Sequence, residues 1–288
     1  MSATRSRVTI PRPSPLQRLF DSLRWTRSSY TLLSGFLALL FLIGYVWWPL
    51  LHEYLAYIDP AYPIYRQLDW LLIGIFLFMS LMIMAQADLK NDLPIVLIGL
   101  IGGLVIESWG TQTELWVYYT SERPPLWIIP AWPIASLSID RLYGLLRQLT
   151  LDLPRRLFDL LHWLMLPAFY ALMLYFVSPT IDRSLTIMAI GLCTFLILTP
   201  NRTRTVSLTF IAGSGLGYFL ERWGTTRLCW TYYTLATPPL FAVLAHGMAA
   251  VAFRRVLDLY LLFAPKIAAA LAGFPSPSRD IEPPLLDR

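Results

Sequence analysis

A block of this chain occurs twice, with thirteen identical residues separated by a constant 114 positions. Most of these residues are tryptophan, tyrosine, glycine or proline, and a constant offset over so many of them is not expected by chance. The matched pairs are Gly99/Gly213, Gly103/Gly217, Glu107/Glu221, Trp109/Trp223, Gly110/Gly224, Thr111/Thr225, Trp116/Trp230, Tyr118/Tyr232, Tyr119/Tyr233, Thr120/Thr234, Pro124/Pro238, Pro125/Pro239 and Leu126/Leu240. The chain is therefore predicted to consist of a duplicated unit.

The composition indicates a membrane protein. Of the 288 residues, 56% are hydrophobic and 14% are charged, whereas a soluble domain carries about 25% charged residues. Several apolar runs reach the roughly 20 residues that a helix needs to cross a bilayer. Eight spans are predicted, near residues 31–51, 70–87, 93–108, 126–143, 157–178, 184–199, 205–221 and 239–262. They leave no room for a separate soluble domain.

The offset also predicts an architecture. It maps spans two, three and four onto spans six, seven and eight, and spans one and five occupy equivalent places. Because each unit has an even number of spans, both units point the same way, with a pseudo-twofold axis along the membrane normal. The predicted fold class is an all-α, polytopic membrane helical bundle of two parallel four-helix repeats. The boundaries are 1–29 for a basic N-terminal tail, 30–150 and 151–265 for the repeats, and 266–288 for a proline-rich C-terminal tail.

The distribution of charge predicts the orientation. Residues 1–29 contain six arginines and one acid, and the loops near 144–156 and 200–204 are also basic. The positive-inside rule then places both termini in the cytosol and both motifs on the outer face of a bacterial-type inner membrane. The basic tail is expected to meet anionic membrane lipids, and nucleic acid is not an expected partner. The first span is expected to stay in place as an anchor, because no cleavage site follows it.

The residue types exclude several kinds of site. Three histidines and two cysteines form no haem-attachment or zinc pattern. Cys193 and Cys229 are expected at different membrane depths and are not expected to form a disulfide. No phosphate-binding glycine motif is present, which disfavours a nucleotide-driven pump. Neither a metal nor a cofactor is therefore expected.

Each motif begins with two glycines and a glutamate at intervals of four residues, ending in Glu107 or Glu221. Residues four apart lie on one face of a helix, so each helix has a smooth stripe with an acid at its outer end. Such stripes allow close helix packing. If the third and seventh spans face each other, Glu107 and Glu221 form an acid pair able to hold and donate a proton. Alternatively, each stripe packs against the next span of its own unit, and each glutamate bonds into its own loop.

An aromatic loop follows each glutamate. Its tryptophans and tyrosines suit a membrane interface, where the ring and the polar tip are both satisfied. Gly110 and Gly224 are expected to permit a tight turn, and the second proline of each pair to open the next helix. The functional alternative is an aromatic mouth that orients a ligand over the acids and stabilises positive charge. The candidate binding residues are Trp109, Trp116, Tyr118, Tyr119, Trp223, Trp230, Tyr232 and Tyr233.

The two units differ at one informative place, where Trp132 in the first corresponds to His246 in the second. A buried structural histidine is one interpretation. The other is a proton relay to Glu221, which would make the second unit the active one. Arg141 and Arg255 are also related by the offset. They are expected either to reach lipid headgroups or to bind a substrate's phosphate.

The stretch from Glu107 through Gly110, Thr113, Tyr118 and Tyr119, then Pro125, Pro130, Ala131 and Trp132, resembles the signature region of the membrane carotenoid hydratases. Those enzymes act on bacterioruberin-type or gamma-carotene-type precursors. The resemblance covers about 30 residues of 288. It implies acid-catalysed addition of water to a terminal isoprenoid double bond without a metal or nucleotide, with Glu107 as the protonating residue.

Three functions remain open at this point. The first is a cofactor-independent enzyme acting on a lipidic or isoprenoid substrate, with Glu107 or Glu221 as general acid and His246 as a relay. The second is a proton-coupled carrier or flippase of an amphipathic molecule, which the duplication favours. The third is a non-catalytic assembly partner within a homo-oligomer or membrane complex, with the aromatic loops as its docking surface.

Overall fold

The computed structural model describes residues 14, 17, 21 and 23–271. Most of the predicted basic tail, and residues 272–288 of the predicted C-terminal tail, lie outside the described residues. Within that part of the chain the protein is all-α, apart from one pair of short strands. The predicted all-α class is thereby confirmed.

A helix occupies each of the eight segments predicted as spans. The α-helices are α2 (Arg27–Val46), α3 (Trp48–Ala56), α4 (Trp70–Met84), α5 (Leu89–Gln112), α6 (Ala131–Leu149), α7 (Arg155–Phe176), α8 (Ser184–Leu198), α9 (Thr203–Thr226) and α10 (Leu240–Leu271). Two 3-10 turns, Ile64–Arg66 and Ser178–Thr180, lie in the loops. Four of the described helices, α2, α5, α7 and α10, are long and apolar enough to cross a membrane.

Several helix boundaries differ from the prediction, and two of the differences bear on the motifs and the tail. In the first unit the helix begins at Ala131 and not directly after Pro125, because Pro130 follows a run of turns and caps the helix. In the second unit Leu244 occupies the place of Pro130, and α10 begins immediately after Pro239. The last helix also continues to Leu271, past the predicted start of the tail at residue 266.

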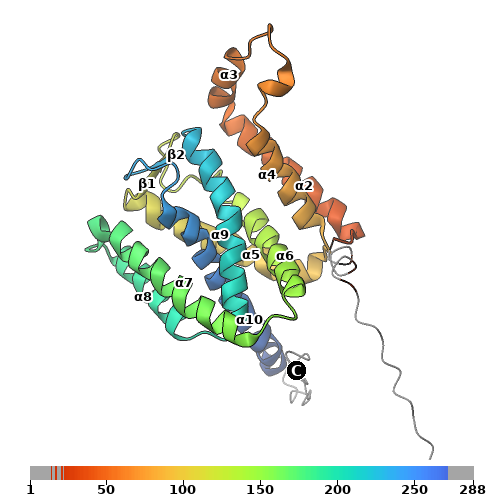
Figure 1. Cartoon of the computed structure of the whole chain (residues 1–288), viewed down its shortest axis with the longest axis vertical. Coiled ribbons are helices and arrows are strands. Elements are labelled where there is room, and N and C mark those ends of the chain that lie inside the picture. Colours follow the sequence, from red (N-terminus) through yellow and green to blue (C-terminus); the bar gives the residue numbers. More distant parts are fainter. Residues whose placement is uncertain (1–13, 15–16, 18–20, 22, 272–288) are drawn as a thin grey trace, which may run out of the picture.

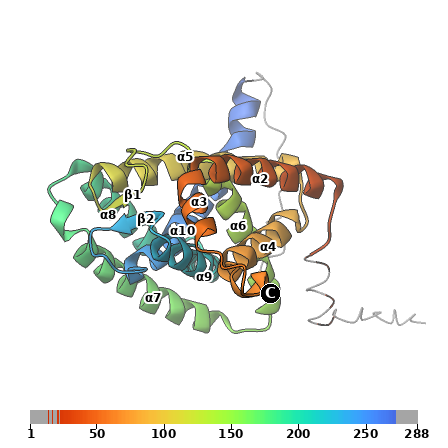
Figure 2. The same ribbon diagram turned by 90° about the horizontal axis from the view of Figure 1, so that it is seen from above.

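The helices that carry and follow the two motifs form the centre of the molecule. α5 packs against α6, α9 packs against α10, and α6 and α10 join the two hairpins by contacts to α9 and α5. The α2–α4 arm and the α7–α8 hairpin lie on opposite sides of this centre (Figures 1 and 2). The side chains of both motifs are therefore held among several helices.

The two aromatic loops meet in a small antiparallel sheet that the sequence analysis did not predict. β1 (Trp116–Tyr118) pairs with β2 (Trp230–Tyr232), with Val117 opposite Thr231 at the centre. The pairing places Trp116 opposite Tyr232 and Tyr118 opposite Trp230. Each motif therefore stabilises the backbone of the other.

Candidate functional site

Glu107 lies near the end of α5, is 4% exposed, and accepts three hydrogen bonds. The indole Nε1 of Trp116 donates to Oε2 at 3.0 Å. The hydroxyl of Tyr118 and the indole Nε1 of Trp132 donate to Oε1 at 2.9 and 3.1 Å. Because an indole N–H only donates, the three partners together favour a carboxylate that accepts on both oxygens.

Glu221 on α9 has a matching environment with one chemical difference. It is also 4% exposed. Trp230 donates to Oε2 at 2.9 Å, and the hydroxyl of Tyr232 donates to Oε1 at 2.9 Å. The third partner is Nε2 of His246, 3.0 Å from Oε1. An imidazole nitrogen can either donate or accept, so this carboxyl and its neighbour can share a proton.

The phenols that bind the glutamates remain hydrogen-bond donors. Tyr118 and Tyr232 lie on the two short strands, outside the helices. Burial, together with the nearby glutamates, raises the pKa of both hydroxyls well above the usual value for tyrosine. Neither phenol therefore supplies a proton near neutral pH, and their role at the site is to orient the carboxyl groups.

Gly110 and Gly224 allow the indole rings to reach the glutamates. Both lie inside their helices, so the predicted role in a turn was wrong. A Cβ atom on Gly110 would be 1.9 Å from Trp116, and one on Gly224 would be 2.0 Å from Trp230. The missing side chain lets each ring lie directly on the helix, with its N–H within reach of the glutamate one turn earlier.

The other glycines pack within their own hairpin. A Cβ atom on Gly103 would meet Trp132 at 2.2 Å, and one on Gly217 would meet His246 at 2.6 Å. The expectation that the two stripes face each other was therefore wrong, and the alternative was right. The physical reason is that a large ring on the next helix needs this space to reach the glutamate.

The two glutamates do not hydrogen-bond to each other. The rings of their third partners, Trp132 and His246, instead stack with centroids 5.7 Å apart and an interplanar angle of 16°. The acid sites are thus connected through this pair of rings at the centre of the molecule.

Four of the predicted binding residues fix the two motifs to the surrounding helices. Tyr119 donates to the carbonyl of Val46 at the end of α2, and Tyr233 donates to that of Phe176 at the end of α7. The indole Nε1 of Trp109 donates to the hydroxyl of Thr186 at 3.1 Å, and that of Trp223 donates to the carboxylate of Asp69 at 2.9 Å. The tyrosines thus hold the loops, and the tryptophans hold the ends of α5 and α9, so the polar atoms of all four residues are engaged within the protein.

A narrow cleft lies below the stacked rings, mainly between α6 and α10, and its cavity volume is about 20 Å³. Trp132 and His246 line one end, and Asp140, Tyr143 and Arg254 line the other. Its walls are mostly apolar, and are formed by Ile95, Ala135, Ile139, Ala249, Ala250 and Phe253 together with Ser136 and Thr209. His246 therefore connects a buried carboxyl group to an apolar cleft.

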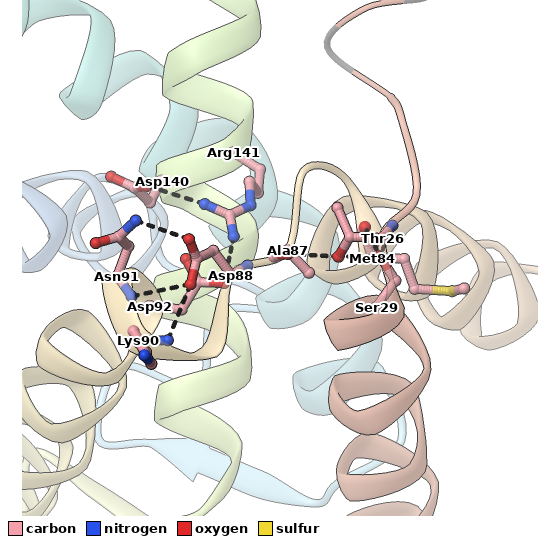
Figure 3. A network of polar contacts seen from close by, with 10 residues as sticks. All are labelled: Thr26, Ser29, Met84, Ala87, Asp88, Lys90, Asn91, Asp92, Asp140 and Arg141. Atoms are coloured by element: carbon pink, nitrogen blue, oxygen red, sulfur yellow. Dashed lines mark hydrogen bonds and ion pairs between the residues drawn. The ribbon is translucent and has the colours of Figure 1, made fainter.

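Arg141, predicted to reach lipid headgroups or a phosphate, is engaged within the protein. Its guanidinium lies 2.6 Å from Asp92 and 3.7 Å from Asp140. Asp140 in turn pairs with Arg254 at 3.0 Å, and Arg254 with Asp258 at 3.1 Å. Figure 3 shows Arg141 between the two acids, beside the α4–α5 corner. Arg141 is therefore neutralised within the protein, by Asp92 of α5 and by Asp140 of its own helix.

This chain of ion pairs was not predicted from the sequence, although a signal was present. Asp140 and Arg254 are related by the same offset of 114 and carry opposite charges. Charged residues at matched positions within apolar segments can satisfy each other when the units face one another. Arg255, by contrast, lines a second cleft and has no ion-pair partner in the described part of the chain.

Comparison with protein-family models, curated protein sequences and solved structures found no match to this chain. No role is therefore carried over from a relative, and the resemblance to carotenoid hydratases stays a prediction.

Proposed function

We propose that this is a multi-pass membrane protein that binds a lipidic or isoprenoid substrate and transfers a proton to it from the Glu221–His246 pair. In this proposal the eight predicted segments span the membrane as two parallel repeats of four. The membrane is a bacterial-type inner membrane, and the acid sites lie toward its outer face. The observation that carries the proposal is the contact of His246 with both Glu221 and the apolar cleft.

The chemistry of the two partners supports a single active pair. At the first site both indole neighbours of Glu107 only donate, and the hydroxyl of Tyr118 is the one hydrogen-bond partner among the described residues that can also accept. No imidazole of the described chain stands there to carry a proton onward. At the second site a protonated Glu221 can donate to Nε2 of His246. The other ring nitrogen of His246 has no hydrogen-bond partner among the described residues. A proton can thus be passed through the ring.

The cleft supports an apolar substrate. Its walls are mostly hydrophobic, and the rings of Trp132, Tyr143 and Phe253 contribute to its lining. Aromatic faces attract positive charge and so favour a carbocation formed on a bound alkene. A lipid or isoprenoid chain combines the two properties, an apolar body and a reactive double bond.

Hydration is the reaction proposed. His246 gives its Nδ1 proton to one alkene carbon while Glu221 returns a proton to Nε2, which leaves a carbocation and a carboxylate. A water oxygen bonds to the carbocation and loses a proton to Nδ1, and the reverse transfer restores the protonated Glu221. The net change is addition of one water molecule, and the catalyst is regenerated.

The test is a mass-spectrometric analysis of lipid and pigment extracts from cells that lack the chain or express one form of it. The forms are the wild type, Glu221→Gln, His246→Trp and the control His52→Trp. The first unit shows that tryptophan fits this position, because Trp132 donates to Glu107 from the matching place. His52 is exposed on α3, so its replacement is the same chemical change away from the site.

The expected result is a product heavier than its precursor by one water molecule in cells with the wild type and with His52→Trp. Glu221→Gln and His246→Trp, at equal abundance in the membrane, accumulate the precursor. An identical set of lipids in all five strains would overturn the proposal and favour the carrier or the assembly partner.

A further inference from the structure

We infer that the second cleft, between α8, α9 and α10, is a binding site for a phosphate group. Its cavity volume is about 20 Å³, and it lies at the end of the bundle opposite the aromatic loops. Thr209 and Arg254 line both clefts, but neither hydrogen-bonds to Glu221 or His246, so the inference does not rest on the proposed reaction.

An uncompensated cation is the first observation. Arg255 lines the cleft, and its buried Nε has no hydrogen-bond partner. No carboxylate among the described residues pairs with it. Its neighbour Arg254 differs, because Asp140 and Asp258 hold it at 3.0 and 3.1 Å. Of the two arginines that line this cleft, Arg255 is thus the one whose guanidinium has an N–H donor without an acceptor among the described residues. A planar guanidinium matches the geometry of phosphate oxygens.

The beginning of α9 is the second observation. Residues 199–201 and Thr205 line the cleft, and the helix starts between them at Thr203. No side chain caps this end, and its first turn holds no acid. The first backbone N–H groups of a helix have no partner within the helix, and the helix dipole favours an anion there.

A buried hydroxyl is the third observation. Thr209 is 4% exposed and lines the cleft, yet its Oγ1 has no hydrogen-bond partner. A buried hydroxyl without a partner costs free energy unless a ligand or water satisfies it. Within a helix such a hydroxyl often donates to the carbonyl four residues earlier, as Thr111 and Thr225 do in this protein. The hydroxyl of Thr209 remains available to a phosphate oxygen.

The charges around the cleft favour an anion of this kind. Asp258 is already paired with Arg254, and Asp159 accepts a hydrogen bond from Thr203. Arg255 is thus the arginine lining the cleft that no carboxylate neutralises among the described residues. A phosphate monoester offers several oxygens, which can accept from this guanidinium and from the hydroxyl of Thr209. The ligand is either free phosphate or the headgroup of a phosphorylated lipid.

The experiment measures binding by the purified full chain in detergent, using isothermal titration calorimetry. One arm uses inorganic phosphate and the other uses dihexanoyl phosphatidic acid, with dihexanoyl phosphatidylcholine as the lipid control. The variants are Arg255→Gln, Thr209→Val and the matched control Arg155→Gln, which replaces an exposed arginine at the same end of the bundle. Arg255→Lys keeps the charge if glutamine disturbs folding.

We expect Arg255→Gln to weaken binding about 10-fold or more, since hydrogen bonds to charged groups contribute strongly. Thr209→Val weakens it several-fold, and Arg155→Gln leaves it unchanged. Binding in both arms, or in the phosphate arm alone, identifies a site for free phosphate, whereas binding of phosphatidic acid alone identifies a lipid headgroup. If no probe binds the wild type, or if Arg255→Gln and Arg155→Gln bind equally, the inference is overturned.

Discussion

The two acid sites share their geometry and differ in one ring. Each glutamate is buried to the same extent and accepts from a tryptophan and a tyrosine of its own loop at nearly the same distances. The third donor is an indole at Glu107 and an imidazole at Glu221. The third ring at Glu107 can only donate, whereas the third ring at Glu221 can donate or accept. The comparison teaches that a single substitution in a duplicated scaffold changes the proton chemistry available at one of two matched acid sites.

The largest loss of stability is expected when a side chain is added at the glycines against which the rings of Trp116 and Trp230 pack. Gly110→Ala and Gly224→Ala place a methyl group about where the ring of Trp116 or Trp230 now lies. Each should destabilise the protein by about 3 kcal/mol, because the ring must leave its glutamate. Thermal unfolding in detergent measures the change.

The matched control is Gly215→Ala on α9, where an added Cβ meets nothing within 4 Å. It should change stability by at most about 1 kcal/mol. Equal losses of stability in Gly110→Ala and Gly224→Ala would show that the two sites are alike in energy as well as in geometry. If alanine is tolerated at either position, the two sites are not alike in this respect.

The next largest effect is a difference in stability between the Glu107→Gln and Glu221→Gln variants. Glu107→Gln must place its amide N–H₂ against an indole N–H, whichever way it turns, since donors face both oxygens. Glu221→Gln can direct its amide toward His246, which then accepts. Glu107→Gln should therefore cost about 1–3 kcal/mol more than Glu221→Gln.

Unfolding midpoints of the two glutamine variants, measured in the same detergent, decide this prediction. The order in stability is opposite to the order proposed for function, in which the second site matters more. Equal midpoints would show that the imidazole does not adapt, and would remove the main difference between the sites.

The smallest effect concerns the loops. Glu114 and Leu228 occupy matched positions and both have a left-handed backbone, with φ of 60° and 56°. Leu228→Gly should stabilise the protein by about 1 kcal/mol because it removes the steric cost of this conformation. Glu114→Gly should gain less, since it also loses the surface ion pair to Arg123 at 2.7 Å. Unfolding midpoints would show the difference, and a larger gain at Glu114 would contradict it.

The sequence predicted the all-α class, a helix in each of the eight predicted segments, and a glutamate near the end of both α5 and α9. These rest on apolar runs and on a constant offset, which are properties of the chain alone. It did not predict that Gly110 would lie within a helix, because the cause is an indole that folds back from Trp116. Nor did it predict the strand pairing of Val117 with Thr231, since three residues carry too little pattern to show a partner so far along the chain.

The site was predicted in its residues and only partly in its contacts. His246 was recognised as the difference between the units, and its bond to Glu221 follows that expectation. Two packing partners were considered for each glycine stripe, and only the next helix of the same unit proved right. The spacing of residues along a helix does not show which neighbouring helix covers them. The pairing of Arg141 with Asp92 was not predicted, since Asp92 lies on a different helix.

The central claim is that an exchangeable proton resides at the second acid site and not at the first. Infrared difference spectra of the purified chain between about pH 5 and pH 8, the range in which histidine changes charge, measure it directly. The wild type should show coupled carboxyl and imidazole bands that are absent in His246→Trp and stronger in Trp132→His, which gives Glu107 an imidazole. Unchanged bands in His246→Trp would contradict the account, because the proton would then reside elsewhere.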